Sequence, residues 1–203
     1  QFIKDMAAIC RRHGILLVDD EVQAGMGRTG RMWAIEHFDV APDILCTAKA
    51  LGSGLPIAAT IFPARLDMGH GAHSNTFGGN LLACASATAT LDVIEEEGLI
   101  ERAASLGEHL HRRLKELAEL HEIIGDVRGL GLMQAIELVK DRETKEHAVM
   151  ERESVITHAY KRGLILLPAG RSAIRLIPPL TVDKDFLDEG VEILDAALRE
   201  VRK

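Results

Sequence analysis

The first half of the chain alternates short apolar runs with segments of helical spacing. Residues 15–18, 44–47 and 57–62 are apolar or nearly so, which is typical of strands buried on both faces of a parallel sheet. Helical spacing predicts one helix over 1–13, with Gly14 as a left-handed C-terminal cap, and another over 81–97. This alternation predicts an α/β, doubly wound domain, whose ligands bind at the carboxyl ends of the strands.

The second half carries a leucine stripe and a different order of elements. The stripe predicts a long helix over 100–120 with one face in the core; its members are Leu106, Leu110, Leu114, Leu117 and Leu120. Short strands are expected within 123–138 and 164–177, on either side of a helix near 150–162, and a last helix over 183–202. This order predicts a smaller α+β domain, so we divide the chain into residues 1–102 and 103–203.

A carboxylate and a lysine follow two of the predicted strands. Asp20 comes after the run 15–18, and Lys49, 29 positions later, comes after the run 44–47 and before a glycine-rich loop. Pyridoxal phosphate needs such a pair, since a lysine binds it covalently and a carboxylate faces its protonated pyridine nitrogen. Taken singly, a lysine after a strand or an acidic run such as 19–21 is more often a solvated surface feature.

These residues stand in motifs that resemble one family along nearly the whole chain. The segments VDDEVQAGMGRTG, AKALGSGLP, HSNTFGGNLLAC and AIRLIPPLTV are similar to segments of the class III (omega-amino acid) aminotransferases, in the family's order. The resemblance implies that Asp20 faces the pyridine nitrogen, that Gln23 contacts the ring hydroxyl, and that Lys49 is the catalytic, covalent lysine. It also implies that Thr76 reaches the cofactor phosphate of the other subunit, and that Arg175 binds a substrate carboxylate.

The resemblance implies a fold-type-I enzyme that uses pyridoxal 5'-phosphate. Residues 1–102 would be the C-terminal part of its large domain and 103–203 its small C-terminal domain, in a homodimer with shared active sites. The reaction implied moves an amino group from an omega-amino acid, similar to 4-aminobutyrate, to a 2-oxo acid such as 2-oxoglutarate. Ornithine or acetylornithine aminotransferases and amino-acid racemases of the same family are the alternatives.

The chain also resembles only the C-terminal part of such an enzyme, because it opens inside a helical pattern at Gln1. The family's preceding half supplies the glycine-containing phosphate loop, the aromatic residue that stacks on the ring and a glutamate that pairs with the substrate-binding arginine. A fragment that does no chemistry alone, and serves as a dimerisation unit, is therefore a second hypothesis.

Two nucleotide-binding interpretations compete for the same residues. The acidic run at 19–21 is compatible with a magnesium-binding strand of a nucleotide hydrolase, although the chain has no G-x-x-x-x-G-K-[ST] loop. Residues 25–30 match G-x-G-x-x-G, but a dinucleotide fingerprint opens a helix and precedes an acid about 20 residues later. We expect no metal site, because His70 and His73 have no further ligand at metal spacing.

Composition restricts the partners and the compartment. A net charge of −7 and a pI near 5.7 argue against nucleic acid or an anionic membrane as partner. The 47% hydrophobic and 27% charged residues are those of a globular protein without a membrane span or signal peptide. Cys10, Cys46 and Cys84 lie among apolar neighbours, so we expect buried thiols in a reducing compartment, the cytoplasm.

Overall fold

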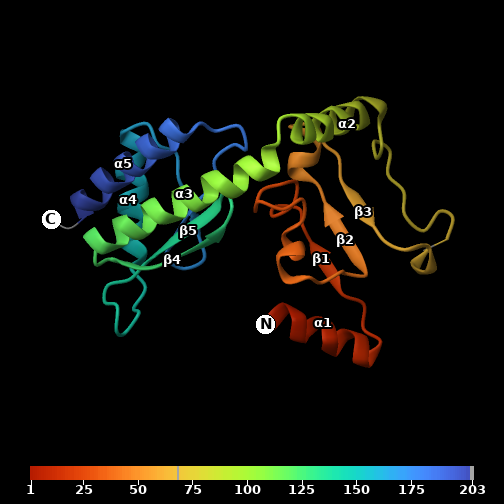
Figure 1. Ribbon diagram of the computed structural model, residues 1–203, viewed down its shortest axis with the longest axis horizontal. Helices are drawn as coiled ribbons and strands as arrows, with labels where there is room; N and C mark the ends of the chain where they lie inside the picture. The colour runs from red at the N-terminus through yellow and green to blue at the C-terminus, as the bar shows by residue number, and fades with distance from the viewer. Residues whose placement is uncertain (68, 202–203) are drawn as a thin grey trace. The chain divides into compact units, whose positions relative to one another are not determined.

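The chain forms two compact units, and the structure, a computed structural model, describes residues 1–67 and 69–201. The first unit is Gln1–Glu101, and the second begins at Arg102. Helix α3 (Leu99–Leu120) carries the chain from one to the other (Figure 1). Among the described residues, no helix is long and apolar enough to cross a bilayer.

A three-stranded sheet in the order β1-β2-β3 is the centre of the first unit. β1 (Val18–Asp20) is parallel to β2 (Ile44–Thr47), and β3 (Ala59–Ile61) is antiparallel to β2. Helix α1 (Phe2–His13) ends at Gly14, whose φ of 65° confirms the predicted left-handed cap. The connections contain short 3-10 helices, which are η1 (Ala34–Phe38), η2 (Lys49–Gly52) and η3 (Ala64–Leu66).

The first strand begins later than its apolar run predicts. The backbone N–H of Leu17 donates to Asp43 Oδ2 at 3.0 Å, and its carbonyl accepts from the N–H groups of Asp43 and Ile44. The ladder with β2 therefore starts only at Val18, which is 55% exposed. The prediction of a strand buried on both faces is wrong here, because Val18 and Asp20 are exposed on one face of β1.

Helix α2 (Leu81–Glu96) forms where the apolar spacing predicts it. The side chain of Asn80 accepts a hydrogen bond from the N–H of Ala83 at 2.9 Å, so it satisfies one of the free donors of the first turn. The three cysteines are free thiols, and each is half-buried rather than buried.

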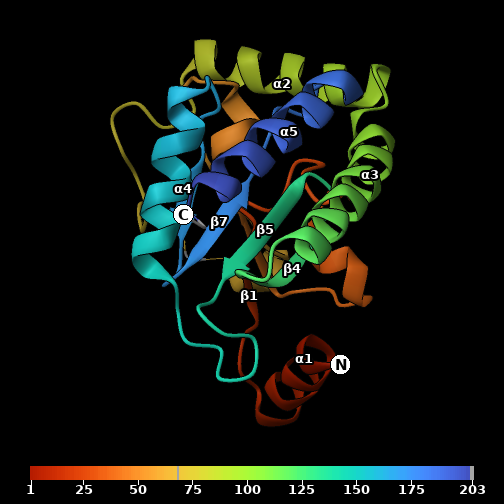
Figure 2. The same ribbon diagram turned by 90° about the vertical axis from the view of Figure 1, so that its left-hand side faces the viewer.

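Four antiparallel strands in the order β4-β5-β7-β6 form the sheet of the second unit. They are β4 (Ile124–Leu130), β5 (Met133–Leu138), β6 (Leu167–Ala169) and β7 (Ala173–Leu176). Helices α3, α4 (Val149–Lys161) and α5 (Lys184–Val201) lie on one face of this sheet (Figure 2). β5 shows the expected alternation, since Gln134, Ile136 and Leu138 are buried and the residues between them are half-buried.

The leucine stripe of α3 lies in the core of the second unit, as predicted. Leu110, Leu114 and Leu117 are buried and Leu106 packs against them, whereas Leu120 is 60% exposed at the last position of the helix. The predicted strands at 123–138 and 164–177 each form a pair of strands, and α4 and α5 follow their predicted ranges within two residues. Arg202, the predicted end of the last helix, lies outside the described residues.

Gly107 on α3 allows the helix to touch the turn between β4 and β5. A Cβ at this position would overlap the backbone of Gly131, closer than real Cβ atoms approach backbone. We expect Gly107→Ala to lower the free energy of unfolding by about 2–3 kcal/mol, because helix and turn must separate. Gly190→Ala in α5 is the matched control, since its Cβ would meet only Leu164 Cδ1 at 3.8 Å, and it should stabilise by up to ~1 kcal/mol. Denaturant midpoints that move equally for the two variants would contradict this account of the packing.

Candidate active site

Asp20 and Lys49 lie at the same edge of the first sheet. Asp20 is the last residue of β1 and pairs in register with Cys46 of β2. The ladder continues one bond further, since the N–H of Glu21 donates to the carbonyl of Cys46 at 2.9 Å. Lys49 follows β2 by two residues. Because the carboxyl ends of parallel strands lie next to each other, this pairing brings the carboxylate and the lysine to the same end of the sheet.

Asp20 presents its carboxylate to solvent. Residues alternate along the strand, so Val18 and Asp20 are exposed on one face and Asp19 is half-buried on the other. One oxygen of Asp20, Oδ1, accepts the N–H of Val22 at 3.1 Å, which fixes the side chain over the turn that follows. Gln23 is in the same turn and is also exposed.

The backbone around Lys49 is held in an uncommon conformation. Lys49 has a φ of 20° and Ser53, at the end of η2, has a φ of 45°. Residues with a Cβ rarely adopt positive φ, and such residues are concentrated at functional sites. Helix α2 supports this turn, because Ser86 Oγ donates to the carbonyl of Gly52 at 2.8 Å and Ser53 Oγ lies 2.9 Å from Thr90 Oγ1. The backbone turn that carries Lys49 is therefore supported by hydrogen bonds from α2, whereas the Lys49 side chain is exposed.

The glycine-rich segment after β1 forms turns rather than the start of an α-helix. Residues 22–33 are turns and bends, and η1 follows. Gly25 packs against the ring of Trp33, where a Cβ would lie 2.8 Å from Trp33 Cε3. A dinucleotide fingerprint would open a helix directly, so this geometry disfavours the nicotinamide interpretation.

Thr76 lies in an exposed segment before α2. It is four residues from the capping residue Asn80, and within the described part of the chain its side chain makes no hydrogen bond. Neighbouring residues of this segment, among them His73, Asn75 and Phe77, line a cavity of about 770 Å³ together with residues of β3 and its flanks. The segment is thus open to a ligand or to another chain.

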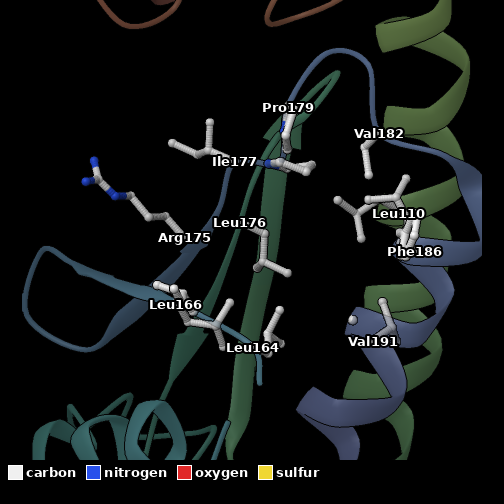
Figure 3. Close-up of a pocket in the computed structure, with 14 residues that line it drawn as sticks. Leu110, Leu164, Leu166, Arg175, Leu176, Ile177, Pro179, Val182, Phe186 and Val191 are labelled. Carbon is white, nitrogen blue, oxygen red and sulfur yellow. The ribbon is translucent and has the colours of Figure 1, made fainter. Parts of the chain in front are cut away.

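Arg175 belongs to β7 of the second unit. It pairs with Ala135 on β5 and Leu167 on β6, so it projects from the middle of the sheet. An apolar cavity of about 300 Å³ lies beside it, and Figure 3 shows the Arg175 side chain extending away from Leu110 and Phe186 of that cavity. Its Nε atom is buried and has no hydrogen-bond partner among the described residues. An arginine without an anionic partner suits an anionic ligand such as a carboxylate.

Glu21 is the buried acid that sequence reasoning missed. Acidic runs are more often solvated, but Glu21 is 2% exposed and its Oε1 accepts the N–H of Ile35 at 2.9 Å. Burial, and then the nearby charge of Asp19, raise the pKa of Glu21 to about 7. The position of the acid two residues after Asp19, on the same side of the strand, is the signal that could have revealed it.

The described residues contain no cluster of three or more His, Cys, Asp or Glu side chains that could hold a metal ion. The first unit instead brings a lysine and a carboxylate to the same end of its sheet.

A model of the class-III aminotransferases matches residues 1–198 of this sequence. The chain belongs to the class-III aminotransferase family. Its sequence is 46% identical over 204 residues to the leucine/methionine racemase of Thermococcus litoralis, covering 100% of this chain and 46% of the racemase. It is also 41% identical over 203 residues to a probable 4-aminobutyrate aminotransferase of Bacillus subtilis, covering 98% of this chain and 47% of that protein.

Solved structures agree with the family at the level of the fold. A pyridoxal-phosphate-bound amine transaminase from an uncultivated Pseudomonas species superposes with a TM-score of 0.89 and 38% identity, covering 96% of this chain and 47% of that one. The chain thus has the fold of the pyridoxal-phosphate-dependent aminotransferases, and pyridoxal 5'-phosphate is the family's cofactor. It spans about half the length of the curated relatives it matches.

Proposed function

We propose that this chain is the C-terminal part of a pyridoxal-phosphate-dependent aminotransferase. In this proposal it moves an amino group from an omega-amino acid, similar to 4-aminobutyrate, to a 2-oxo acid such as 2-oxoglutarate. The observation that carries the proposal is the parallel pairing of β1 with β2, which ends both strands at the edge where Asp20 and Lys49 lie.

The residues of this edge fit the cofactor by their chemistry. Bound pyridoxal phosphate would supply an electron sink for the bond that breaks at the amine-bearing carbon of the substrate. Lys49 supplies the amine that holds the cofactor and afterwards moves a proton as general base and acid. The Asp20 carboxylate keeps the pyridine nitrogen protonated, and Gln23 orients the ring hydroxyl.

Arg175 and Thr76 have binding roles of their own in this proposal. The guanidinium of Arg175 has two parallel N–H donors, which match a carboxylate and hold the substrate in one orientation. Thr76 binds the cofactor phosphate of a neighbouring subunit, which requires a homodimer with shared sites; the exposure of residues 69–79 supports this. The first unit is then the C-terminal part of the large domain and the second unit is the small domain, in a cytoplasmic enzyme.

The donor is best determined by direct comparison. We expect the full enzyme to convert 4-aminobutyrate with 2-oxoglutarate faster than ornithine or acetylornithine. Similarity to a leucine/methionine racemase supports one alternative, the inversion of an α-amino acid. Chiral chromatography of L-leucine after incubation, beside an assay of 4-aminobutyrate consumption with 2-oxoglutarate, distinguishes the two, because only racemisation produces D-leucine. Inversion without 2-oxoglutarate-dependent consumption would replace the proposed reaction by the alternative.

Arg175→Gln tests the carboxylate site. We expect KM for a donor with a carboxylate to rise about 10- to 100-fold, because a charge-assisted hydrogen-bonded pair contributes about 1.5–3 kcal/mol. KM for an alkylamine without a carboxylate should change little. Arg171→Gln is the matched control, since Arg171 is an exposed arginine in the turn between β6 and β7. An equal effect of Arg175→Gln on both donors would show that the arginine has a structural role only.

A further inference from the structure

Asp19 and Glu21 form a pair of carboxyl groups, here called the carboxyl pair, on the side of β1 opposite Asp20. Glu21 is 2% exposed and Asp19 is half-buried. Asp19 Oδ2 and Glu21 Oε2 are both buried without a donor among the described residues. Two buried acceptors that lack donors are costly, since each loses its hydrogen bonds to water.

A single proton shared between Asp19 Oδ2 and Glu21 Oε2 would give both oxygens a hydrogen-bond partner. If Glu21 is protonated, its O–H becomes a donor, and the neighbouring Asp19 carboxylate is the acceptor that needs one. We propose that Glu21 keeps its proton near neutral pH and donates it to Asp19, and that this bond positions the loop that carries Asp20 and Gln23. In this role Glu21 is a positioning residue, because it acts through Asp20 and touches neither substrate nor cofactor.

The contacts of Glu21 show how it holds this loop. Its Oε1 accepts the N–H of Ile35 at 2.9 Å, its backbone N–H donates to the carbonyl of Cys46 at 2.9 Å, and its carbonyl accepts from Gly25 at 3.1 Å. One residue thus ties the end of β1 to β2, to the first turn of the loop and to the start of η1. Asp20 is the preceding residue, so its direction depends on the same ties.

The charges around the pair favour the protonated form. Burial first, then the Asp19 carboxylate, raise the pKa of Glu21, while the backbone N–H groups of Ile35 and Ala34 at the start of η1 lower it. Burial and then the Asp20 charge raise the pKa of Asp19, whereas a hydrogen bond donated by Glu21 would lower it. β2 faces Glu21 with the carbonyl of Cys46, which is uncharged.

The sign of the pH effect follows from the raised pKa. Glu21 holds its proton more tightly in the folded chain than in the unfolded one, where its pKa is the ordinary 4.5. The stabilisation is complete below pH 4.5 and is lost as pH rises through about 7. Glu21→Gln preserves the donor and the shape but cannot ionise, so it should retain the stabilisation at every pH.

Chemical denaturation of the full 203-residue chain at pH 5 and pH 8 tests the proposal. We expect the unfolding constant of the wild type, divided by that of Glu21→Gln, to rise about 10- to 100-fold between the two pH values. Glu36→Gln, on the exposed side of η1, should leave the corresponding ratio unchanged. A ratio for Glu21→Gln that stays constant would show that Glu21 is already ionised at pH 5, and would overturn the proposal.

Infrared spectroscopy supplies a second test, which detects the proton directly. The carbonyl stretch of a protonated carboxyl should be present at pH 6 and disappear by pH 9, and Asp19→Asn should shift it. Absence of this band at pH 6 would also overturn the proposal. The position of the proton is independent of the proposed function, whereas the effect on Asp20 rests on it. If the band is present and cofactor binding fails, only the proposed function is wrong.

Discussion

Lys49→Ala is expected to abolish covalent attachment of pyridoxal phosphate. The wild-type protein, incubated with the cofactor and reduced with borohydride, should carry one added pyridoxyl group on the peptide that contains Lys49. The variant should carry none, because the loop after β2 contains no other lysine. This loop lies at the end of the sheet where Asp20 also lies. Turnover should fall by at least about 10²–10⁴-fold, the contribution of a positioned general base alone. Peptide mass mapping and steady-state kinetics measure the two effects.

Two further variants separate the covalent role of Lys49 from its charge and from general lysine reactivity. Lys49→Arg keeps the positive charge but cannot form the linkage, so it should behave like Lys49→Ala. Lys115→Ala removes an exposed lysine of α3 and should change neither the adduct nor the rate. An adduct that persists in Lys49→Ala, or that is spread over several lysines, would refute the proposed site. An adduct only in an N-terminally longer protein would mean that the family is right and that this chain lacks part of the cofactor site.

Much of the fold could be predicted from the sequence because the relevant signals are local. Helix α1 has apolar spacing and a glycine that suits its C-terminal cap, and β2 is an apolar run of the length of a strand. The leucine stripe of α3 predicts its own burial up to Leu117. Asp20 and Lys49 could be singled out because each follows an apolar run and both stand in motifs of one family.

The remaining features depend on contacts between distant residues. β1 is displaced because the Asp43 side chain, 26 residues away, takes the N–H of Leu17. Glu21 appears in the sequence as one member of a charged run, and its burial results from the return of the chain at Ile35. The close contact of Gly107 with Gly131 is likewise invisible along the chain. Local patterns therefore predicted which elements form, whereas edge strands, buried acids and tight contacts required the tertiary structure.

Asp20→Asn should separate cofactor attachment from catalysis. An amide has nearly the shape of a carboxylate but no charge, so it cannot keep the pyridine nitrogen protonated, and the ring becomes a weaker electron sink. We expect the borohydride-reduced adduct at Lys49 to persist while kcat falls about 100-fold or more, the scale of losing one electrostatic interaction in a transition state. The pH at which the absorbance of the bound cofactor changes should also shift.

The matched control for Asp20→Asn is Asp39→Asn. Asp39 has an 85% exposed side chain and a φ of 52°, which asparagine tolerates, so its replacement should leave kcat unchanged. A normal kcat in Asp20→Asn, together with a strong loss in Asp19→Asn, would transfer the pyridine-nitrogen role to Asp19. That result would also contradict the carboxyl pair, because Asp19 cannot both accept the proton of Glu21 and face the ring from the opposite side of β1. Comparing the Asp19 and Asp20 variants therefore tests which aspartate faces the pyridine nitrogen. It also tests which face of β1 is turned toward the cofactor.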